Sequence, residues 1–167
     1  MTFKQIYTRA VNRKGGQELA ASLPKVKSRQ ALIRATDDSY LSEMTKCVFR
    51  SGFVWKIVEN KWSNFETAFA GFNPKAIANF SDERLESLAQ DTSIIRNMTK
   101  ILATRENAKF ILDANSEHKT FGRFLADWPE DDIVGLLLYL KKHGSRLGGH
   151  TGQYFLRFVG KDTFMFS

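Results

Sequence analysis

Apolar residues recur every three or four positions along most of the chain, which is the period of an α-helix that packs on one side. Between residues 38 and 61 this pattern predicts a buried helix that breaks near Gly52. A longer helix is predicted from about residue 97 to residue 112. Few runs alternate between apolar and polar residues as strands do. The pattern therefore predicts an all-α fold of about seven to nine short helices, arranged as a two-lobed helical bundle.

Capping residues predict where several of these helices begin. A side-chain oxygen at the N-cap accepts a hydrogen bond from a free N–H of the first turn. Proline fits the first helical position, and acids in the first turn complement the helix dipole. The predicted starts are Ser63 with Glu66 as a capping box, Asn73 followed by Pro74, Ser81 followed by Asp82 and Glu83, and Pro129 with the three acids after it.

The stretch KKHGSRLGGHTGQ, residues 141–153, combines four glycines with several cations and no acid. With its flanks it predicts a helix over residues 133–143, a tight turn over 144–150 and a second helix over 151–158. Glycine adopts left-handed backbone conformations readily, so such a turn can reverse the chain sharply. The alternative without a ligand is an ordinary connection between two helices, in which a glycine forms the C-cap of the first helix.

The same turn can expose backbone N–H groups at the start of the second helix, where the helix dipole is positive. Exposed amides hold a phosphate in place without reading a base sequence. Cations on both sides of the turn add Coulomb attraction to such an anion. These cations are Lys141, Lys142, Arg146 and Arg157.

Positive charge is concentrated near the N-terminus. The formal net charge is +7, and residues 1–35 hold eight Lys or Arg but the single acid Glu18. Residues 36–167 carry equal numbers of basic and acidic side chains. We therefore divide the chain into a basic N-terminal segment, 1–35, and a helical domain, 36–167. A concentrated positive field favours polyanions such as nucleic acid. The alternative is a solvated basic arm with no specific partner.

The remaining composition excludes other classes of protein. A single cysteine, Cys47, rules out an internal disulfide and a cysteine-rich zinc site. No stretch reaches the roughly eighteen apolar residues of a membrane span, and no secretory signal follows Met1. A cytoplasmic protein is expected, associated with the nucleoid if the source is bacterial.

Three blocks of sequence form a specific combination. They are the Gly-x-x-Trp segment from Gly52 to Trp55, the segment from Ala68 to Pro74, and the Ile-Ile-Arg-Asn-x-x-Lys-Ile run from Ile94 to Ile101. Together they resemble the central blocks of the DNA-3-methyladenine glycosylase I family, with Asn73 where that family has Asp. Residues 141–153 continue the resemblance as the family's helix-hairpin-helix motif. The match covers about residues 36–160.

This resemblance implies a DNA repair glycosylase that flips an alkylated purine out of the duplex and hydrolyses its N-glycosidic bond. A base inside a duplex is unreachable, so it must be extruded into an aromatic pocket. Alkylation at N3 makes adenine cationic, and a cationic base is already a good leaving group that stacks well on an electron-rich ring. The expected partner is double-stranded DNA with alkylated bases, and the expected oligomeric state is a monomer.

The resemblance also implies which residues form the site. Trp55 aligns with the tryptophan that stacks on the flipped base, and Phe49, Arg50 and Phe53 lie on the same segment. For Tyr40, a core or surface role is an equal alternative to a place in the pocket. The expected DNA contacts are Lys141, Lys142, Arg146, Gly148, Gly149, His150, Thr151, Gly152 and Gln153.

Several positions depart from the family pattern. Cys47 stands where the family has a Glu that bonds the alkylated adenine, and Glu43, one helical turn earlier, is a weaker substitute. The Cys and His residues of the family's zinc clamp are missing, so we expect neither a metal ion nor a cofactor. Asp162 is a weak candidate for the catalytic Asp of the wider superfamily. The alternatives are a chain that lacks a final helix, or a type I member that needs no such Asp.

Two further functions compete with the glycosylase. One is a catalytically weak or inactive DNA-binding module that recognises damaged or abasic DNA, which the thiol at Cys47 and the missing Asp favour. The other is a helical adaptor for another protein, which would leave the glycines of the turn without a role.

Overall fold

A computed structural model describes residues 25–161 of the chain. All regular structure in these residues is helical, which confirms the predicted all-α fold, and the ten α-helices and one 3₁₀ helix slightly exceed the number predicted. The described elements are α3 (Arg29–Arg34), α4 (Asp37–Arg50), α5 (Trp55–Asn60), α6 (Trp62–Ala68), η1 (Ala70–Phe72), α7 (Pro74–Ala78), α8 (Asp82–Leu88), α9 (Met98–His118), α10 (Phe121–Asp127), α11 (Ile133–His143) and α12 (Gly149–Val159).

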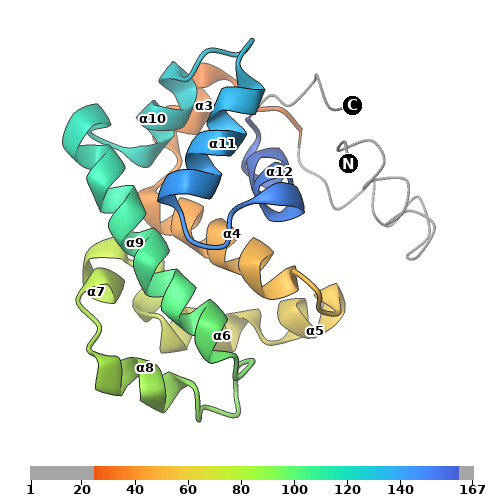
Figure 1. The fold of residues 1–167 in the computed structure, drawn as a ribbon, viewed down its shortest axis with the longest axis vertical. Coiled ribbons are helices and arrows are strands. Elements are labelled where there is room, and N and C mark those ends of the chain that lie inside the picture. Colours follow the sequence, from red (N-terminus) through yellow and green to blue (C-terminus); the bar gives the residue numbers. More distant parts are fainter. Residues whose placement is uncertain (1–24, 162–167) are drawn as a thin grey trace.

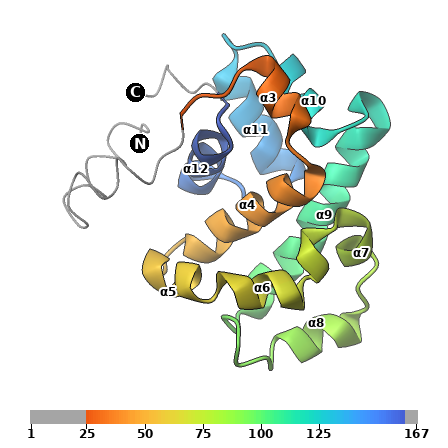
Figure 2. The same cartoon turned by 180° about the vertical axis from the view of Figure 1, so that it is seen from behind.

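Two long helices, α4 and α9, run through the middle of the molecule and separate two groups of shorter helices (Figures 1 and 2). One group consists of α3, α10, α11 and α12, and the other of α5 to α8. At its N-terminal end, α4 is tied to its neighbours by Asp37. The Asp37 carboxylate accepts hydrogen bonds from the Asn115 side chain at 2.7 Å and from the Phe121 backbone N–H at 3.0 Å.

The lobe of α5 to α8 is organised around a ladder of aromatic rings. The Trp62 ring stacks on the rings of Phe65 and Phe72, with centroids 4.9 and 5.2 Å apart, and Phe69 continues the stack. All four side chains are buried. Each such ring removes a large apolar area from water, so this ladder holds the second lobe against α4.

Several predicted helix starts are confirmed. The side chain of Asn73 caps α7 with Pro74 at the first position, and that of Ser81 caps α8. Asn97 caps α9, which continues six residues beyond the predicted end at residue 112. The predicted break near Gly52 is also present, since α4 ends at Arg50 and Gly52 has a left-handed φ of 69°.

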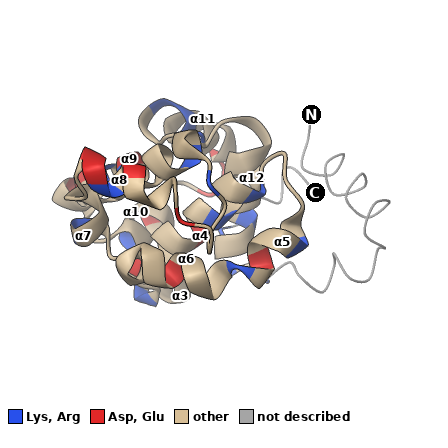
Figure 3. Cartoon of the chain, turned by 90° about the horizontal axis from the view of Figure 1, so that it is seen from below, with Lys and Arg blue, Asp and Glu red and all other residues tan. Residues whose placement is uncertain are grey.

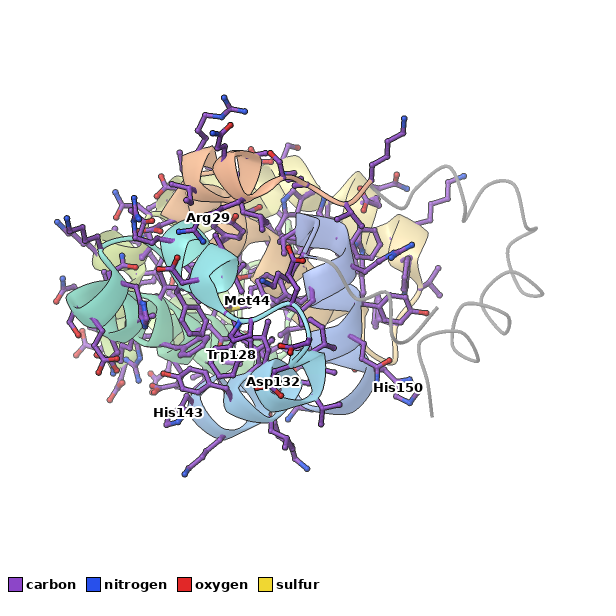
Figure 4. The ribbon with its side chains drawn as sticks, turned by 90° about the horizontal axis from the view of Figure 1, so that it is seen from above. Arg29, Met44, Trp128, Asp132, His143 and His150 are labelled. Atoms are coloured by element: carbon purple, nitrogen blue, oxygen red, sulfur yellow. The ribbon has the colours of Figure 1, made fainter. Side chains whose placement is uncertain are left out.

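Two predicted starts are wrong. Ser63 lies inside α6, because only Lys61 separates α5 from α6 and the chain never extends enough to form a side-chain cap. Pro129 and the first two acids after it precede α11, whose N-cap is Asp132. The Trp128 indole donates to the Asp132 carbonyl at 2.9 Å, which closes a turn and delays the helix; Figure 4 shows these two side chains together.

Part of the predicted basic segment packs into this fold. The backbone N–H of Lys27 donates to the Gly160 carbonyl at 2.8 Å, and Arg29 pairs with Asp127 of α10. Leu32 of α3 is buried. The charge of Arg29 is therefore paired with an acid within the fold. Four other basic residues of the N-terminal segment, Lys4, Arg9, Arg13 and Lys14, lie outside the described residues.

Among residues 25–161, no helix combines the length and the apolar character that crossing a bilayer requires. The same residues contain no group of three or more His, Cys, Asp or Glu side chains placed to hold a metal ion.

Candidate functional site

Trp55 is the first residue of α5 and lies where the two lobes meet the C-terminal helix α12. The left-handed Gly52 turns the chain out of α4 and delivers the indole to this position. The ring is half-buried, with edge-to-face contact to Tyr154 at 5.2 Å and a tilted contact to Phe158 at 5.9 Å between centroids. An indole held by aromatic edges presents a fixed, electron-rich face to a planar partner.

The face of Trp55 is occupied by Arg50, from the last turn of α4. The guanidinium carbon lies 5.0 Å from the Trp55 ring centroid and 4.8 Å from that of Phe158, so the cation contacts both rings from one side. Only 9% of the Arg50 side chain is exposed. These rings come from α5 and α12, and the structure brings them together with the end of α4.

Two carboxylates hold the Arg50 guanidinium in this place. It lies 3.4 Å from Glu43 Oε1 and forms a close ion pair with Glu59, to which Lys46 adds a contact of 3.6 Å. Burial alone would raise the pKa of the Glu59 carboxyl, but hydrogen bonding and charge from Arg50 and Lys46 outweigh it and lower this pKa below its ordinary value. The cluster therefore combines two carboxylates with two basic side chains, and it favours the ionised form of Glu59.

Cys47 lies in the same part of α4, buried beneath this network. Its Sγ is 3.9 Å from Glu43 Oε1. Burial, together with the negative charge of Glu43, raises the pKa of the Cys47 thiol well above its usual range, although Arg50 and Lys46 oppose the shift. Cys47 is thus a neutral thiol at pH 7. The carboxylate nearest to this thiol is that of Glu43.

The other residues expected in the pocket divide into core and surface. Tyr40 and Phe49 are buried. The hydroxyl of Tyr40 donates to the Leu32 carbonyl at 2.5 Å, and burial with the charge of Asp37 raises its pKa. Both side chains face the packed side of α4, so Tyr40 has the core placement that was the alternative for it, and a role of Phe49 in the pocket stays a prediction. Phe53, in contrast, is 41% exposed and lies two residues before Trp55 in the chain.

The helix predicted over residues 133–143 is present as α11, and α12 begins two residues earlier than predicted. Arg146 in the turn between them and Gly149, the first residue of α12, adopt left-handed φ angles of 58° and 57°. No side chain caps the N-terminus of α12. Lys141, Lys142, Arg146 and His150 are exposed around the turn, and blue segments follow α11 and α12 in Figure 3. In Figure 4, His150 points outward from the start of α12.

Not every residue expected to contact DNA reaches the surface of this turn. Thr151 and Gly152 are buried, and Gln153 is half-buried. A Cβ on Gly152 would lie 2.4 Å from the Leu147 carbonyl oxygen, so Gly152 allows the two helices to approach closely. A Cβ on Gly149 would meet nothing within 4 Å. Gly149 is therefore the glycine of this pair that faces solvent, whereas Gly152 packs against Leu147, and its contact with DNA stays a prediction.

Sequence reasoning missed two residues that position these elements. Asn107 of α9 is fully buried, accepts from the Ser145 N–H at 2.7 Å and donates to the Ser145 carbonyl at 3.0 Å. Lys100, also from α9, donates to the carbonyls of Phe49 and Ser51 at 3.1 and 2.7 Å. Burial, then the charge of Arg146, lowers the pKa of Lys100. The helix α9 thus supports both the turn and the end of α4. The one sequence signal for this was the presence of polar residues, Lys100 and Asn107, on the buried face of α9.

Glu59 and the pair Tyr154 and Phe158 were also absent from the predicted site. The two aromatic residues are spaced four apart on α12, which places them on one helix face. That spacing was visible in the sequence, but the sequence did not show that this helix face contacts Trp55. Asp162, the candidate catalytic acid, lies outside the described residues.

Solved structures with the same arrangement of helices define the class to which this fold belongs. A crystal structure of 3-methyladenine DNA glycosylase I (TAG) superposes with a TM-score of 0.65 at 26% identity, covering 77% of this chain and 81% of that one. A structure of the Staphylococcus aureus enzyme, described for its recognition of 3-methyladenine, gives 0.67 at 20% identity over 77% and 79% of the two chains. The protein therefore has the helical DNA glycosylase I fold.

Sequence comparison identifies the family. Residues 33–135, more than half of the chain, match the family model described as methyladenine glycosylase. A curated relative, DNA-3-methyladenine glycosylase 1 of Escherichia coli strain K12, is 34% identical over 92 residues, which are 54% of this chain and 49% of the relative. This chain belongs to the methyladenine glycosylase family, which confirms the resemblance seen in its motifs. The matched part spans about half the length of that relative.

Proposed function

We propose that this protein is a monofunctional DNA glycosylase that removes an alkylated purine of the 3-methyladenine type from double-stranded DNA. The observation that carries the proposal is the half-buried Trp55, held by α12 beside the glycine turn. A base flipped from the duplex would stack on this indole. Family membership and the names of the relatives, which specify 3-methyladenine, support the choice of substrate.

The turn between α11 and α12 provides the proposed contact with the DNA backbone. The N-terminus of α12 has no side-chain cap, and its first residue, Gly149, is exposed. Free N–H groups and a positive dipole bind phosphate at such a helix end. Lys141, Lys142 and Arg146 add charge around it. Because phosphate contacts carry no sequence information, this binding would be independent of the local base sequence.

An apolar surface next to Trp55 suits the space that a flipped base leaves behind. Phe53, Val54 and Ile57 are 41%, 60% and 40% exposed on the loop and first turn of α5. Proteins that distort DNA insert apolar side chains between base steps to replace lost stacking. We assign this role to the loop that carries Phe53.

The proposed reaction is hydrolysis of the bond between the sugar C1′ and the purine nitrogen. The electron pair of that bond leaves with the base, and water adds a hydroxyl to C1′ and releases a proton. Because alkylation gives the base a positive charge, departure neutralises it and needs little help from a general acid. The protein mainly binds the flipped base and keeps it stacked.

The test measures release of free base from methylated DNA. Trp55→Ala is expected to lower the rate by about tenfold or more, because a base stacked on an aromatic ring loses about 1–3 kcal/mol when that ring is removed. Leu138→Ala is the control, since Leu138 is 61% exposed on α11 and makes no part of the site. Equal rates for wild type and Trp55→Ala, with measurable turnover, would refute the proposed role of the indole.

A second candidate is a DNA-binding module that recognises damaged or abasic DNA without cutting it. The observation in its favour is Cys47, a neutral buried thiol where the family has a glutamate. This module would bind such DNA tightly and release no base in the same assay. Detection of released base above the Trp55→Ala level excludes it.

A further inference from the structure

The placement of Arg50 has a consequence for which bases this site can accept. Its guanidinium is a planar, delocalised cation, and it lies against the same indole that the proposed function assigns to a flipped base. An N-alkylated purine is also a planar, delocalised cation. Both stack on aromatic rings through the same attraction between a positive charge and the electron-rich face. The face that Arg50 covers cannot hold both at once.

We propose that Arg50 is an internal competitor for the Trp55 face, and that it thereby determines specificity by admitting bases that carry a positive charge. This inference rests on the proposed function, since it concerns the same base site. It assigns to Arg50 a role in selecting the substrate, and no part in breaking the bond.

Charge balance explains why a cation is favoured as the replacement. While the guanidinium covers the Trp55 face, the basic side chains of Arg50 and Lys46 are paired with the carboxylates of Glu43 and Glu59. If Arg50 moves off the Trp55 face together with Glu59 and a neutral base enters, the Glu43 carboxylate loses its ion pair with the guanidinium in a partly buried place, which is unfavourable. If a cationic base enters, it replaces the missing charge. The network therefore penalises neutral bases.

The contacts of Arg50 also make its departure feasible. Among the described residues, its buried Nε has no hydrogen-bond partner, so this nitrogen loses nothing when the side chain moves. Glu59 is 47% exposed at its side chain, and it gives the guanidinium an anchor at the protein surface. Arg50 can thus keep its ion pair with Glu59 while it leaves the face of Trp55.

Competition within the protein lowers the apparent affinity for any ligand that stacks on the same face of Trp55. If Arg50 covers this face about nine-tenths of the time, the apparent affinity falls about tenfold relative to an uncovered face. Removing the side chain should therefore strengthen binding. A residue that contacts the base favourably would have the opposite effect, so the sign of the change decides between the two roles.

The experiment follows the indole N–H resonance of Trp55, assigned by its loss in Trp55→Phe, while a ligand is added. The probes are 1-methyladenosine, a cation at slightly acidic pH, its neutral counterpart adenosine, and methylguanidinium, which resembles the arginine head group. In Arg50→Ala, 1-methyladenosine is expected to bind about tenfold tighter than in wild type. The gain for adenosine is smaller, because the carboxylates remain. Methylguanidinium shifts the resonance in Arg50→Ala and leaves wild type unchanged.

Arg84→Ala is the matched control, because Arg84 of α8 lies 4.4 Å from the Phe80 ring centroid, contacts no described residue of the base site, and should leave all three titrations as in wild type. Arg50→Gln replaces Arg50→Ala if the latter fails to fold. Unchanged or weaker binding of 1-methyladenosine, or a Trp55 resonance that ignores methylguanidinium in the Arg50 variant, overturns the proposal. Base release from methylated DNA, measured separately, reports on the proposed function itself.

Discussion

Glu59 is a residue whose ionisation the fold couples to stability. Its pKa is lowered because Arg50 and Lys46 bond and attract the carboxylate more than burial opposes it. A carboxyl with a lowered pKa binds fewer protons in the folded state than in the unfolded state. Its contribution to stability is therefore complete above its unfolded pKa and is lost as the pH falls through its folded pKa.

This linkage predicts a pH-dependent difference between wild type and Glu59→Gln. The free energy of unfolding of wild type should exceed that of the variant near neutral pH, because only the carboxylate pairs with Arg50. The difference should shrink as the pH falls below the ordinary glutamate value of 4.5. Urea denaturation at a series of pH values measures it. A difference that stays constant from neutral to strongly acidic pH would show that the ion pair adds nothing to stability.

Two glycines in the first turn of α12, Gly149 and Gly152, differ in how an added side chain would destabilise the protein. Gly149 has a left-handed φ and open space, so Gly149→Ala should lower the free energy of unfolding by about 1 kcal/mol through backbone strain alone. Gly152 is helical and meets a carbonyl oxygen, so Gly152→Ala should cost about 3 kcal/mol or more. Chemical denaturation compares the two. Equal costs would contradict this division between conformation and packing.

At the scale of elements, the helical hairpin of α11 and α12 depends on a residue from another helix. Asn107 of α9 satisfies both backbone groups of Ser145 in the turn. This fixes the turn relative to the end of α4, where Lys100 bonds the last carbonyls. The proposed phosphate contact and the proposed base site therefore have a common support in α9.

Asn107→Ala should lower the free energy of unfolding by about 2 kcal/mol, because it leaves the N–H and carbonyl of Ser145 without their partner. It should also weaken DNA binding, since the turn loses its anchor. The matched control is Asn64→Ala, which removes one exposed hydrogen bond to the Ser93 carbonyl and should cost less than about 1 kcal/mol. If Asn107→Ala loses stability and binds DNA as wild type does, the turn is not a DNA contact.

At the scale of the whole molecule, some basic side chains are paired within the fold and others are exposed where a partner could contact them. Arg29 is paired with Asp127, whereas Lys141, Lys142 and Arg146 are exposed around the turn. Binding of DNA through these cations would release counterions from the phosphates, which makes affinity depend on salt.

We expect the affinity for duplex DNA to fall by at least about tenfold between about 50 and 200 mM salt. Lys142→Gln should weaken binding and reduce the slope of log affinity against log salt by about one. Lys75→Gln, an exposed change on α7 in the other lobe, should leave that slope as it is. Titrations with a fluorescent duplex measure both slopes. Equal slopes for wild type and Lys142→Gln would remove Lys142 from the proposed interface.

The sequence by itself determined the helical class, the break at Gly52, the caps at Asn73 and Ser81 and the end of α11, because these depend on residues within about one turn of each other. It also carried the family motifs. The start of α11 was missed, since the indole of Trp128 that delays it acts through a turn. Only the tertiary structure decided that Arg50 would lie against both Trp55 and Phe158, and that Tyr40 would face the core. Such contacts join residues distant in the chain, and they exist only where packing of the whole fold brings the helices together.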